Sequence, residues 1–353
     1  MTNILVTGAG GYIGCVLVPK LLEKGYTVKA VDRFFFGKDK LAPHENLTII
    51  HEDCRKLKAD HFAGVDAVID LVAISNDPSG EEFKTITYEV NHLARVNAAM
   101  LAKLMGVKRY ILPSSCSIYG FQDQGTIADE NSQTNPLTVY AKANEKAEQG
   151  VLPLADDNFT VTVMRQATVY GYSPRMRFDL AVNGMAYGAW KNGVIPLMRD
   201  GTQWRPMVHV EDTTDIMCLL LEADAKVISG EIFNIGSNRN NYQIGELAET
   251  IAAALPIDVK IEWYGDTDQR SYRVDFTKVE KLLEWQAKFT AADGASQVYY
   301  ALENGTLEKT EQTITLDWYK KLIEWQNIIK QVDMYGGILE MENNTAHGKA
   351  ILL

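Results

Sequence analysis

Short apolar runs rich in β-branched residues alternate with helical patterns through the first half of the chain. The apolar runs predict strands at residues 3–7, 27–32, 47–50, 66–73, 109–115 and 159–165. Helical periodicity between them predicts helices at about residues 12–24, 83–105 and 136–152. Strands that are apolar throughout are buried on both faces, as in a doubly wound parallel sheet with helices on either side. We therefore expect an α/β fold of the Rossmann type.

The pattern changes after residue 172, where the segment "GYSPRMRFD" is rich in turn residues. Later strand and helix signals are more widely spaced, and a short strand and helix expected at 207–222 would return to the sheet, so the two parts interleave. The expected division is a Rossmann domain at 1–172 with 205–235 returning to it, a smaller α/β lobe at 173–204 and 236–326, and a C-terminal extension at 327–353. The extension either packs on a neighbour or frays.

Composition bounds the kind of protein. A chain of 353 residues that is 46% hydrophobic can bury a large core, so we expect a soluble globular protein. It has no apolar run of 18 residues, and its amino terminus enters a strand pattern without a secretion signal, which predicts a cytoplasmic protein. Scattered cysteines (Cys15, Cys54, Cys116 and Cys218) indicate neither a disulfide framework nor a metal site. The net charge of -11 disfavours nucleic acid and acidic membranes as partners, but an anionic small molecule remains compatible if arginines face it.

A glycine-rich turn lies between the first predicted strand and the first predicted helix. The sequence "VTGAGGYIG" places Gly8, Gly11 and Gly14 at GxxGxxG spacing. Glycines let the backbone approach a pyrophosphate, and the unpaired N–H groups of a helix amino terminus bind the anion. Asp32 ends the second strand, 18 residues after Gly14, where a carboxylate accepts hydrogen bonds from both ribose hydroxyls and repels a 2′-phosphate. The turn therefore predicts a dinucleotide site that favours NAD over NADP, although the adjacent Arg33 weakens that preference.

Polar residues follow the fifth predicted strand, in "PSSCSIYG" (113–120), and Tyr140 begins a long helix 25 residues after Ser115. Ligands bind at the carboxyl ends of the strands in open parallel sheets, so Ser115 is expected near the nicotinamide end of a bound dinucleotide. Asp53, at the end of the third strand, fits two roles equally well: contact with the adenine edge, or a strand-end turn.

Together with other segments, these residues give a resemblance that spans nearly the whole chain. The matching segments are "TGAGGYIG", Asp32, "HEDC", "SSCSIYG", "VYAKANEKAE" (139–148), "RQATVYG" (165–171), "GTQWRPMVHVED" (201–212) and "DQRSYRVDFTK" (268–278). The sequence resembles the extended short-chain dehydrogenases/reductases of the nucleotide-sugar epimerase/dehydratase family. The motifs are specific for the family and much less specific for the reaction. The resemblance implies NAD as the cofactor and a nucleotide-diphosphate sugar, bound by the smaller lobe, as the substrate.

The resemblance also assigns catalytic roles. Ser115 would hydrogen-bond the reacting hydroxyl or carbonyl, and Tyr140 of the YxxxK motif would transfer the proton. The lysine of that motif maps to Asn144, because the alanine and glutamate that usually follow it are present as Ala147 and Glu148. In the family the lysine holds the nicotinamide ribose and lowers the phenol pKa from about 10 by its positive charge. Asparagine can keep part of the first role and none of the second.

No other lysine on this helix can take over the role. Lys142 points about 160° away from Tyr140 around the helix and Lys146 about 120° away. We therefore expect Tyr140 to have a less depressed pKa and to be a weaker catalyst, unless a group from elsewhere in the fold supplies charge. Both a natural difference and a deliberate replacement are compatible with Asn144.

The two positions that directly follow Ser115 help to distinguish between possible reactions. Family members that remove water or carbon dioxide have acidic residues there, whereas this chain has Cys116 and Ser117. Members that epimerise carbons beside a ketone have a cysteine where this chain has Ser117, and Cys116 is better explained as a small buried residue than as a base. What remains is hydride transfer from a sugar carbinol to NAD with Tyr140 as base. Return of the hydride gives a 4-epimerase, and release of the product gives a dehydrogenase or ketoreductase. Because of Asn144, a third hypothesis is a regulatory NAD-binding protein without turnover.

The resemblance assigns the substrate diphosphate to Arg205 in "WRPMVHV" and Arg270 in "DQRSY". The other substrate candidates are Ser75, Ser115 and Asn183, while Arg175 and Arg177 fit the cleft and the solvent equally well. The expected cofactor contacts are Gly8, Gly11, Tyr12, Ile13, Gly14, Asp32, Arg33, Asp53, Cys54, Leu71, Ala73, Tyr140 and Asn144. The long helices at 83–105 and 136–152 resemble those that form a four-helix interface in this family, so a homodimer is expected.

Overall fold

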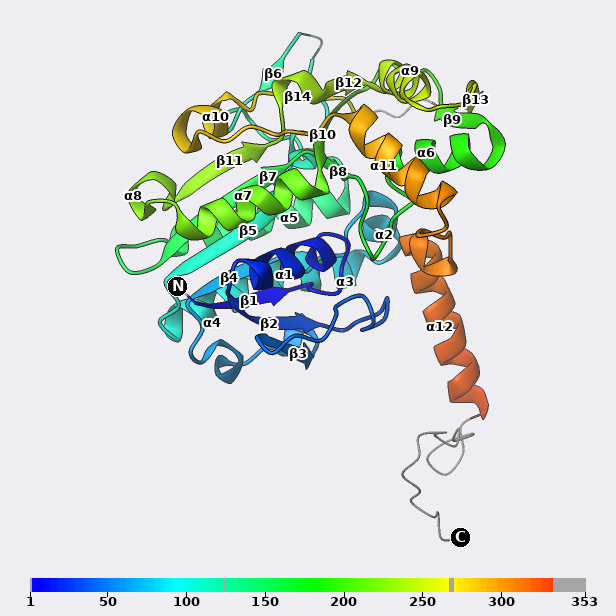
Figure 1. Cartoon of the computed structure of the whole chain (residues 1–353). Helices are drawn as coiled ribbons and strands as arrows, with labels where there is room; N and C mark the ends of the chain where they lie inside the picture. The colour runs from blue at the N-terminus through cyan, green and yellow to red at the C-terminus, as the bar shows by residue number, and fades with distance from the viewer. Residues whose placement is uncertain (1, 124, 267–269, 333–353) are drawn as a thin grey trace, which may run out of the picture.

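A parallel sheet of seven strands forms the centre of the molecule (Figure 1). The computed structural model describes residues 2–123, 125–266 and 270–332. The strand order is β11-β7-β5-β4-β1-β2-β3, and the strands are β1 (Asn3–Thr7), β2 (Thr27–Asp32), β3 (Leu47–His51), β4 (Ala67–Asp70), β5 (Arg109–Ser115), β7 (Thr160–Gln166) and β11 (Glu231–Ile235). The chain builds outward from β1 in one direction and then from β4 in the other. Ligands bind at such a switch point in doubly wound sheets, and the expected Rossmann-type α/β fold is confirmed.

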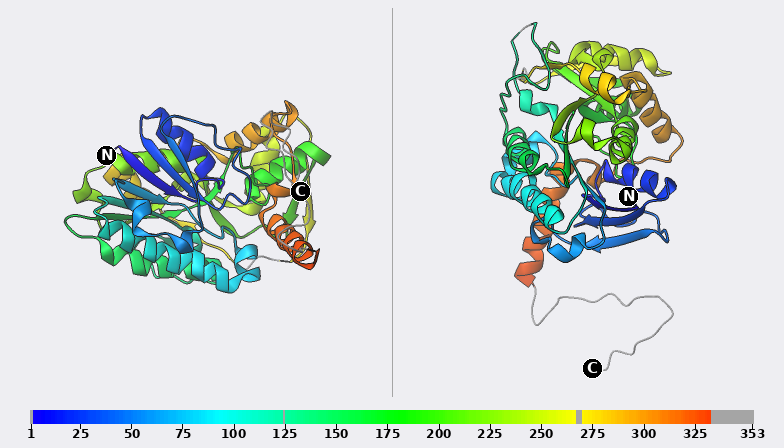
Figure 2. Two further views of the ribbon diagram at one scale, coloured as in Figure 1. Left: turned by 90° about the horizontal axis from the view of Figure 1, so that it is seen from below. Right: turned by 90° about the vertical axis from the view of Figure 1, so that its left-hand side faces the viewer.

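Helices cover both faces of this sheet (Figures 1 and 2). One face carries α1 (Gly14–Glu23) and α7 (Val210–Glu222). The other face carries α4 (Arg95–Leu104) and α5 (Val139–Val151). Successive side chains of β1 pack on opposite faces of the sheet. Ile4 and Val6 belong to the same buried cluster as Leu17 of α1, whereas Leu5 packs in a cluster with Ala98 of α4. The strands are apolar throughout because both faces are buried.

The strands and helices predicted for the first half are confirmed, with two differences. The run at 66–73 pairs only as far as Asp70 of β4, because its neighbour β1 ends at the paired residue Thr7. The helix expected at 83–105 consists of three consecutive segments, α3 (Lys84–Tyr88), a π-helical segment (Glu89–Ala94) and α4. A further helix, α2 (Asp77–Glu82), precedes them and begins where the side chain of Asn76 accepts a hydrogen bond from the N–H of Ser79 at 2.9 Å.

The smaller lobe lies beyond the carboxyl ends of the central strands (Figure 1). Its strands form three small sheets, β12-β10-β8, β13-β9 and β14-β6. The remaining strands and helices are β6 (Ile127–Ala128), β8 (Thr168–Tyr170), β9 (Val194–Met198), β10 (Trp204–His209), β12 (Asn241–Gln243), β13 (Lys260–Tyr264), β14 (Arg273–Val274), α6 (Ala181–Asn192), α8 (Ala225–Ile228), α9 (Ile244–Ala254), α10 (Thr277–Leu283) and α11 (Ala291–Glu303). The strand expected at 207 therefore joins a small sheet through β8, because β11 takes the place beside β7 in the main sheet. The segment that returns to the main sheet is β11, with α7 on its face.

The last described helix, α12 (Thr315–Val332), extends away from the body of the molecule (Figures 1 and 2). The indole N–H of Trp318 donates to the carbonyl oxygen of Phe35 at 2.7 Å, and the ring of Tyr319 lies 5.7 Å from that of Phe35. The helix continues through residue 327, where the extension was expected to begin, and residues 333–353 lie outside the described part. Among the described helices, none is both long and apolar enough to cross a membrane.

Candidate active site

A cavity of about 1620 Å³ runs along the carboxyl ends of the central strands and reaches the smaller lobe. Single small-molecule sites occupy roughly 300–1,000 Å³, so this cavity has room for a dinucleotide together with a second ligand. Its lining includes every predicted site residue except Asn183: Gly8, Gly11, Tyr12, Ile13, Gly14, Asp32, Arg33, Asp53, Cys54, Leu71, Ala73, Ser75, Ser115, Tyr140, Asn144, Arg205 and Arg270. Residues far apart in the sequence thus face one space.

The glycine turn leaves no room for side chains. Gly8 has a positive φ of 64°, and a Cβ there would lie 2.7 Å from the amide nitrogen of Val72. A Cβ on Gly14, the first residue of α1, would lie 2.5 Å from the carbonyl oxygen of Gly8. The turn therefore packs against the residues directly after β4 and opens the amino terminus of α1 to the cavity, as an anionic diphosphate requires.

Arg175 adds a buried positive charge to the same cavity. Its side chain is 4% exposed, and burial, followed by the charge of Arg177, lowers the pKa of Arg175 to about 10. One terminal nitrogen donates to the hydroxyl of Thr315 at 3.0 Å, whereas Nε and Nη1 have no hydrogen-bond partner within the described residues. A buried guanidinium with unused donors fits a phosphate. The residues present therefore fit NAD: the glycine turn and Arg175 would hold the diphosphate, and Asp32 would hold the adenosine ribose.

The carboxylate of Asp32 is fixed by two backbone groups. The N–H of Gly10 donates to Oδ2 at 3.0 Å and that of Phe34 donates to Oδ1 at 2.6 Å. A carboxylate has about four acceptor sites, so acceptors remain for the ribose hydroxyls. The guanidinium of Arg33 lies 3.2 Å from Asp53 and its side chain is 47% exposed. Because its charge is paired with Asp53, Arg33 offers less attraction to a 2′-phosphate than its position in the sequence indicated.

Asp53 itself has the turn role. Its Oδ1 accepts a hydrogen bond from the N–H of Arg55 at 3.0 Å and caps a short 3-10 helix. Hydrogen bonding to the side chain of Arg55 lowers the pKa of Asp53 to about 2. Asp53 also lines the cavity, so contact with adenine stays a prediction.

We expect Asp32→Ala to weaken NAD binding about tenfold, because two charge-assisted hydrogen bonds to ribose are lost. NADP binding should change much less, since removing the carboxylate also removes its repulsion of the 2′-phosphate. Calorimetric titration of both dinucleotides measures the two effects, with the exposed Asp157→Ala as a control. An equal loss for NAD and NADP would contradict this role of Asp32.

Ser115 and Tyr140 meet at the end of β5. Ser115 is the last residue of that strand, and its hydroxyl accepts a hydrogen bond from the N–H of Ser117 at 3.1 Å. Tyr140 is the second residue of α5, whose first turn is capped by the hydroxyl of Thr138. The hydroxyl of Ser115 lowers the pKa of the Tyr140 phenol, and both side chains line the cavity. The two residues expected to act on the reacting oxygen therefore lie near each other in the site.

Charges from several elements act on this phenol. Burial raises the pKa of Tyr140 above its usual value, and the carboxylate of Asp77 raises it further. The hydrogen bond from Ser115 and the guanidinium groups of Arg95 and Arg177 lower the pKa of Tyr140. Together these effects leave the pKa of Tyr140 above its usual value, in the direction expected for a motif without its lysine. Two arginines nevertheless supply positive charge from outside α5.

Asn144 is 1% exposed and lines the cavity one helical turn after Tyr140. Its Oδ1 accepts a hydrogen bond from Nη1 of Arg95 at 3.0 Å, and its Nδ2 donates to the backbone carbonyl of Tyr140 at 3.0 Å. Lys142 and Lys146 are exposed, as their helical positions predicted. The cation nearest to position 144 in these contacts is thus the guanidinium of Arg95.

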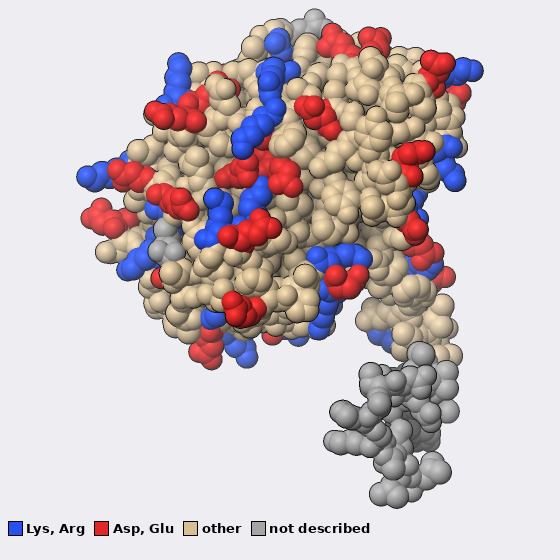
Figure 3. Space-filling model, in the orientation of Figure 1, with Lys and Arg blue, Asp and Glu red and all other residues tan. Residues whose placement is uncertain are grey.

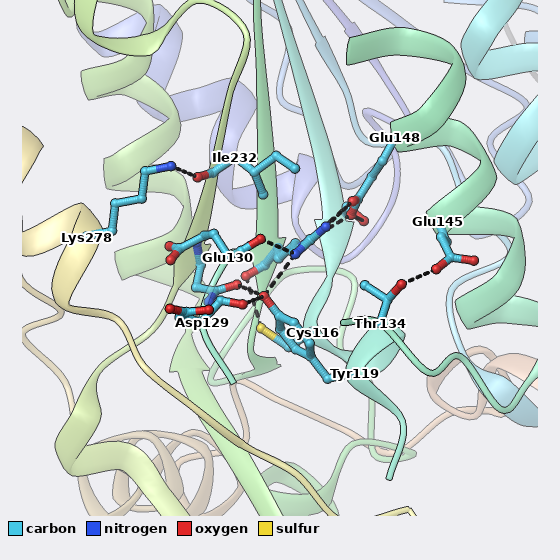
Figure 4. A network of polar contacts seen from close by, with 12 residues as sticks. Cys116, Tyr119, Asp129, Glu130, Thr134, Glu145, Glu148, Ile232 and Lys278 are labelled. Carbon is cyan, nitrogen blue, oxygen red and sulfur yellow. Dashed lines mark hydrogen bonds and ion pairs between the residues drawn. The ribbon is translucent and has the colours of Figure 1, made fainter. Parts of the chain in front are cut away.

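A buried network holds α5 against the sheet (Figure 4). Nη2 of Arg165 lies 2.8 Å from Oε2 of Glu148, and Oε1 of the same carboxylate accepts a hydrogen bond from the hydroxyl of Ser114. Nη1 of Arg165 donates to the hydroxyl of Tyr119 at 3.0 Å. The thiol of Cys116 donates to the carbonyl oxygen of Arg165 at 3.1 Å, and burial raises the pKa of Cys116. Cys116 is therefore the small buried residue expected, and the network fixes Tyr140 by way of its helix.

Two arginines line the cavity on the side of the smaller lobe. Nη1 of Arg205 donates to the carbonyl oxygen of Trp204 at 2.7 Å and to that of Arg270. The guanidinium of Arg205 also lies 5.4 Å from the ring centroid of Tyr272. Arg270 forms an ion pair with Asp77 of α2. These two cavity arginines are cationic groups suited to a diphosphate. On the face shown in Figure 3, acidic and basic side chains are interspersed.

Asn183 is not brought to the cavity surface. It is fully buried; its Oδ1 accepts from the N–H of Gly171 at 2.9 Å, and its Nδ2 donates to the hydroxyl of Tyr12 at 3.1 Å. Its amide joins the glycine turn to the first residues after β8, so we leave it out of the candidate site. Ser75 does line the cavity, where its hydroxyl accepts a hydrogen bond from Nη1 of Arg177 at 3.1 Å.

Two charged residues near Tyr140, Arg95 and Asp77, were not considered from the sequence, and a third, Arg177, had been equally compatible with the cleft and with solvent. A signal for the first was present in the sequence. Asp70 lies in a strand that is apolar on both faces, and a carboxylate buried in such a strand requires a partner. That partner is Arg95, whose Nε lies 3.3 Å from Asp70. The sequence indicated the need for a cation without identifying which one.

Comparison with known proteins gives the class. The model of the NAD dependent epimerase/dehydratase family matches residues 4–236. Putative UDP-arabinose 4-epimerase 2 from Arabidopsis thaliana is 28% identical over 326 residues, covering 82% of this chain and 77% of that protein. UDP-glucuronic acid decarboxylase 6 from the same plant is 29% identical over 309 residues, covering 83% and 86%. The structure of dTDP-glucose 4,6-dehydratase from Streptomyces venezuelae, which contains NAD, superimposes with a TM-score of 0.76 at 25% identity, covering 87% of this chain and 99% of that chain.

The fold and the cavity thus define an enzyme of the extended short-chain dehydrogenase/reductase class. The chain belongs to the NAD dependent epimerase/dehydratase family, which confirms the predicted family and NAD as the cofactor. The relatives include an epimerase, a decarboxylase and a dehydratase. Family membership therefore leaves the particular reaction to be argued from the site.

Proposed function

We propose that this protein is a nucleotide-sugar 4-epimerase. The observation that carries the proposal is the placement of the Ser115–Tyr140 pair in one cavity with Arg205 and Arg270. One pair of residues can handle a sugar hydroxyl while the arginines hold a diphosphate. A protein that only bound NAD as a regulatory signal would have no need for Arg205 and Arg270 in the cavity.

Each residue has a defined task in this proposal. The glycine turn, Asp32 and Arg175 would hold NAD, which would supply a reversible hydride acceptor for the sugar carbinol. Tyr140 takes the hydroxyl proton and gives it back, and Ser115 orients the reacting oxygen through its hydrogen bond. Arg205 and Arg270 hold the diphosphate, so that the sugar extends toward Tyr140. Turnover then leaves the cofactor unchanged.

Elimination and decarboxylation are less well supported. Position 116 is a buried thiol whose pKa is raised by burial, and position 117 is a serine. Neither side chain is a carboxylic acid, whereas the family resemblance implies acidic residues at these positions in members that remove water or carbon dioxide. The 4-epimerases among the relatives give the proposal additional support.

A panel of nucleotide-diphosphate sugars tests the proposal. The purified enzyme with NAD is incubated with each sugar, products are identified by proton NMR, and the absorbance of reduced nicotinamide is followed. A new 4-epimer without accumulation of reduced nicotinamide supports the proposal. Accumulated reduced nicotinamide with a keto sugar would establish a dehydrogenase instead, and NAD binding without any sugar-dependent change would establish a regulatory protein.

We also propose that the protein is a homodimer. Apolar side chains are exposed along the π-helical segment and α4, namely Leu93, Met100 and Leu104. The exposed fraction reaches 76% at Leu104, and a row of apolar residues on one surface is typical of an interface. Sedimentation equilibrium should give twice the chain mass, and a monomer at all concentrations would exclude the dimer. We retain residues 173–204 and 236–326 as the proposed substrate-binding lobe.

A further inference from the structure

The motif position that normally holds a lysine has a cation beside it in the fold. Nη1 of Arg95 lies 3.0 Å from Oδ1 of Asn144, and each residue is 1% exposed. Arg95 comes from α4, directly after the π-helical segment Glu89–Ala94. π-Helical turns are rare and occur frequently at functional sites. The cation thus reaches position 144 from another helix.

The guanidinium is fixed by its remaining donors. Nε lies 3.3 Å from Oδ2 of Asp70, and Nη2 donates to the carbonyl oxygens of Asp70 at 2.8 Å and Pro113 at 2.5 Å. The hydroxyl of Tyr110 donates to the same carboxylate at 2.6 Å, which spreads the charge of Asp70. Arginine suits this place because its planar fork can contact several acceptors at once and stays charged when buried. The ion pair with Asp70 offsets the cost of burying this cation, and its Nη1 is left to bond Asn144.

The charges around Tyr140 leave a role for this cation. Asp77 of α2 disfavours the phenolate, whereas Arg95 and Arg177 favour it and Ser115 hydrogen-bonds it. Both arginines are paired with a carboxylate, Arg95 with Asp70 at 3.3 Å and Arg177 with Asp179 at 2.8 Å. Arg95 is the one of the two arginines that is also bonded to the side chain at position 144.

We propose that Arg95, acting through Asn144, takes the place of the motif lysine as a positioning residue. Its charge stabilises the phenolate of Tyr140, and its hydrogen bond fixes the amide of Asn144, whose Nδ2 is held against α5. This inference rests on the proposed role of Tyr140 in proton transfer. It also implies that a lysine cannot simply be restored, because its ammonium group would meet the guanidinium of Arg95.

The test follows the titration of Tyr140, which requires no turnover. Protein with isotope-labelled tyrosine is titrated with NAD bound, and the Tyr140 signal is assigned by its loss in Tyr140→Phe. Arg95→Met should raise the pKa of Tyr140 by about one unit, because a nearby positive charge is lost. Asn144→Lys alone should give no gain in activity near neutral pH. Arg95→Met combined with Asn144→Lys should bring the Tyr140 pKa back toward that of the parent protein.

Two further variants separate charge from folding. Arg95→Lys keeps the charge and should shift the Tyr140 pKa less than Arg95→Met. Arg109→Met removes another buried arginine at the opposite end of β5, roughly 20 Å along the strand, and should leave the Tyr140 pKa unchanged. If Arg95→Met does not fold, the combined variant and Arg95→Lys decide the question.

The inference is overturned if loss of Arg95 leaves the Tyr140 pKa unchanged, or if Asn144→Lys alone lowers that pKa and raises the rate. A titration that depends on Arg95 in a protein without sugar turnover would refute the proposed function and keep the inference. Sugar turnover with a pH profile that does not change on loss of Arg95 would support the proposed function and refute the inference.

Discussion

Replacement of Tyr140 by phenylalanine is expected to lower kcat by about 10³-fold, because proton transfer by a positioned side chain is lost. The ring keeps its packing, so NAD affinity and thermal stability should not change. Steady-state kinetics with the best sugar of the panel measures kcat, and titration with NAD measures affinity.

The matched control is Tyr300→Phe, at an exposed tyrosine of α11. It should leave kcat unchanged. If Tyr140→Phe retained most of the parent rate, another group would have to move the proton, and the assignment of Tyr140 would be wrong.

Arg205→Met is expected to raise KM by about 100-fold, because a hydrogen-bonded charge pair with the substrate diphosphate is lost. kcat should fall far less, since the diphosphate is bound in both the ground state and the transition state. Arg205→Lys keeps the charge but not the planar fork, so its KM should lie between those of Arg205→Met and the parent. Initial-rate measurements over a range of sugar concentrations give both constants.

Arg239→Met provides the control, because Arg239 is exposed and donates to the carbonyl oxygens of Ala287 and Lys288 outside the cavity. Its kinetic constants should match those of the parent. A loss confined to kcat in Arg205→Met would instead place the guanidinium near the reacting carbon.

The sequence was most informative where local pattern decides structure. The strands of the main sheet are apolar on both faces, so their runs stand out, and Asp32 and Ser115 lie at strand ends that the pattern locates. The glycine turn was equally clear, because Gly8 and Gly14 have no space for a side chain. These features depend on neighbouring residues and could be predicted.

The features that escaped prediction depend on distant partners. Arg95 and Asn144 are separated by 49 positions, and no periodicity links them. Asn183 was expected at a ligand, but its amide is used by Gly171 and Tyr12. The strand expected at 207 was predicted to return to the main sheet, but β10 pairs with β8 in a small sheet, because an apolar run alone does not determine its partner strand. The contact between Arg95 and Asn144 therefore became visible only in the fold.

The proposed 4-epimerase reaction requires that a hydride leave and return to the same sugar carbon while Tyr140 moves the proton. The most direct test uses the best nucleotide sugar of the panel with deuterium at C4, mixed with unlabelled sugar. We predict a 4-epimer in which deuterium stays at C4, with none lost to solvent. Loss of deuterium to water, a keto product that accumulates with reduced nicotinamide, or the absence of any epimer across the panel would contradict the account.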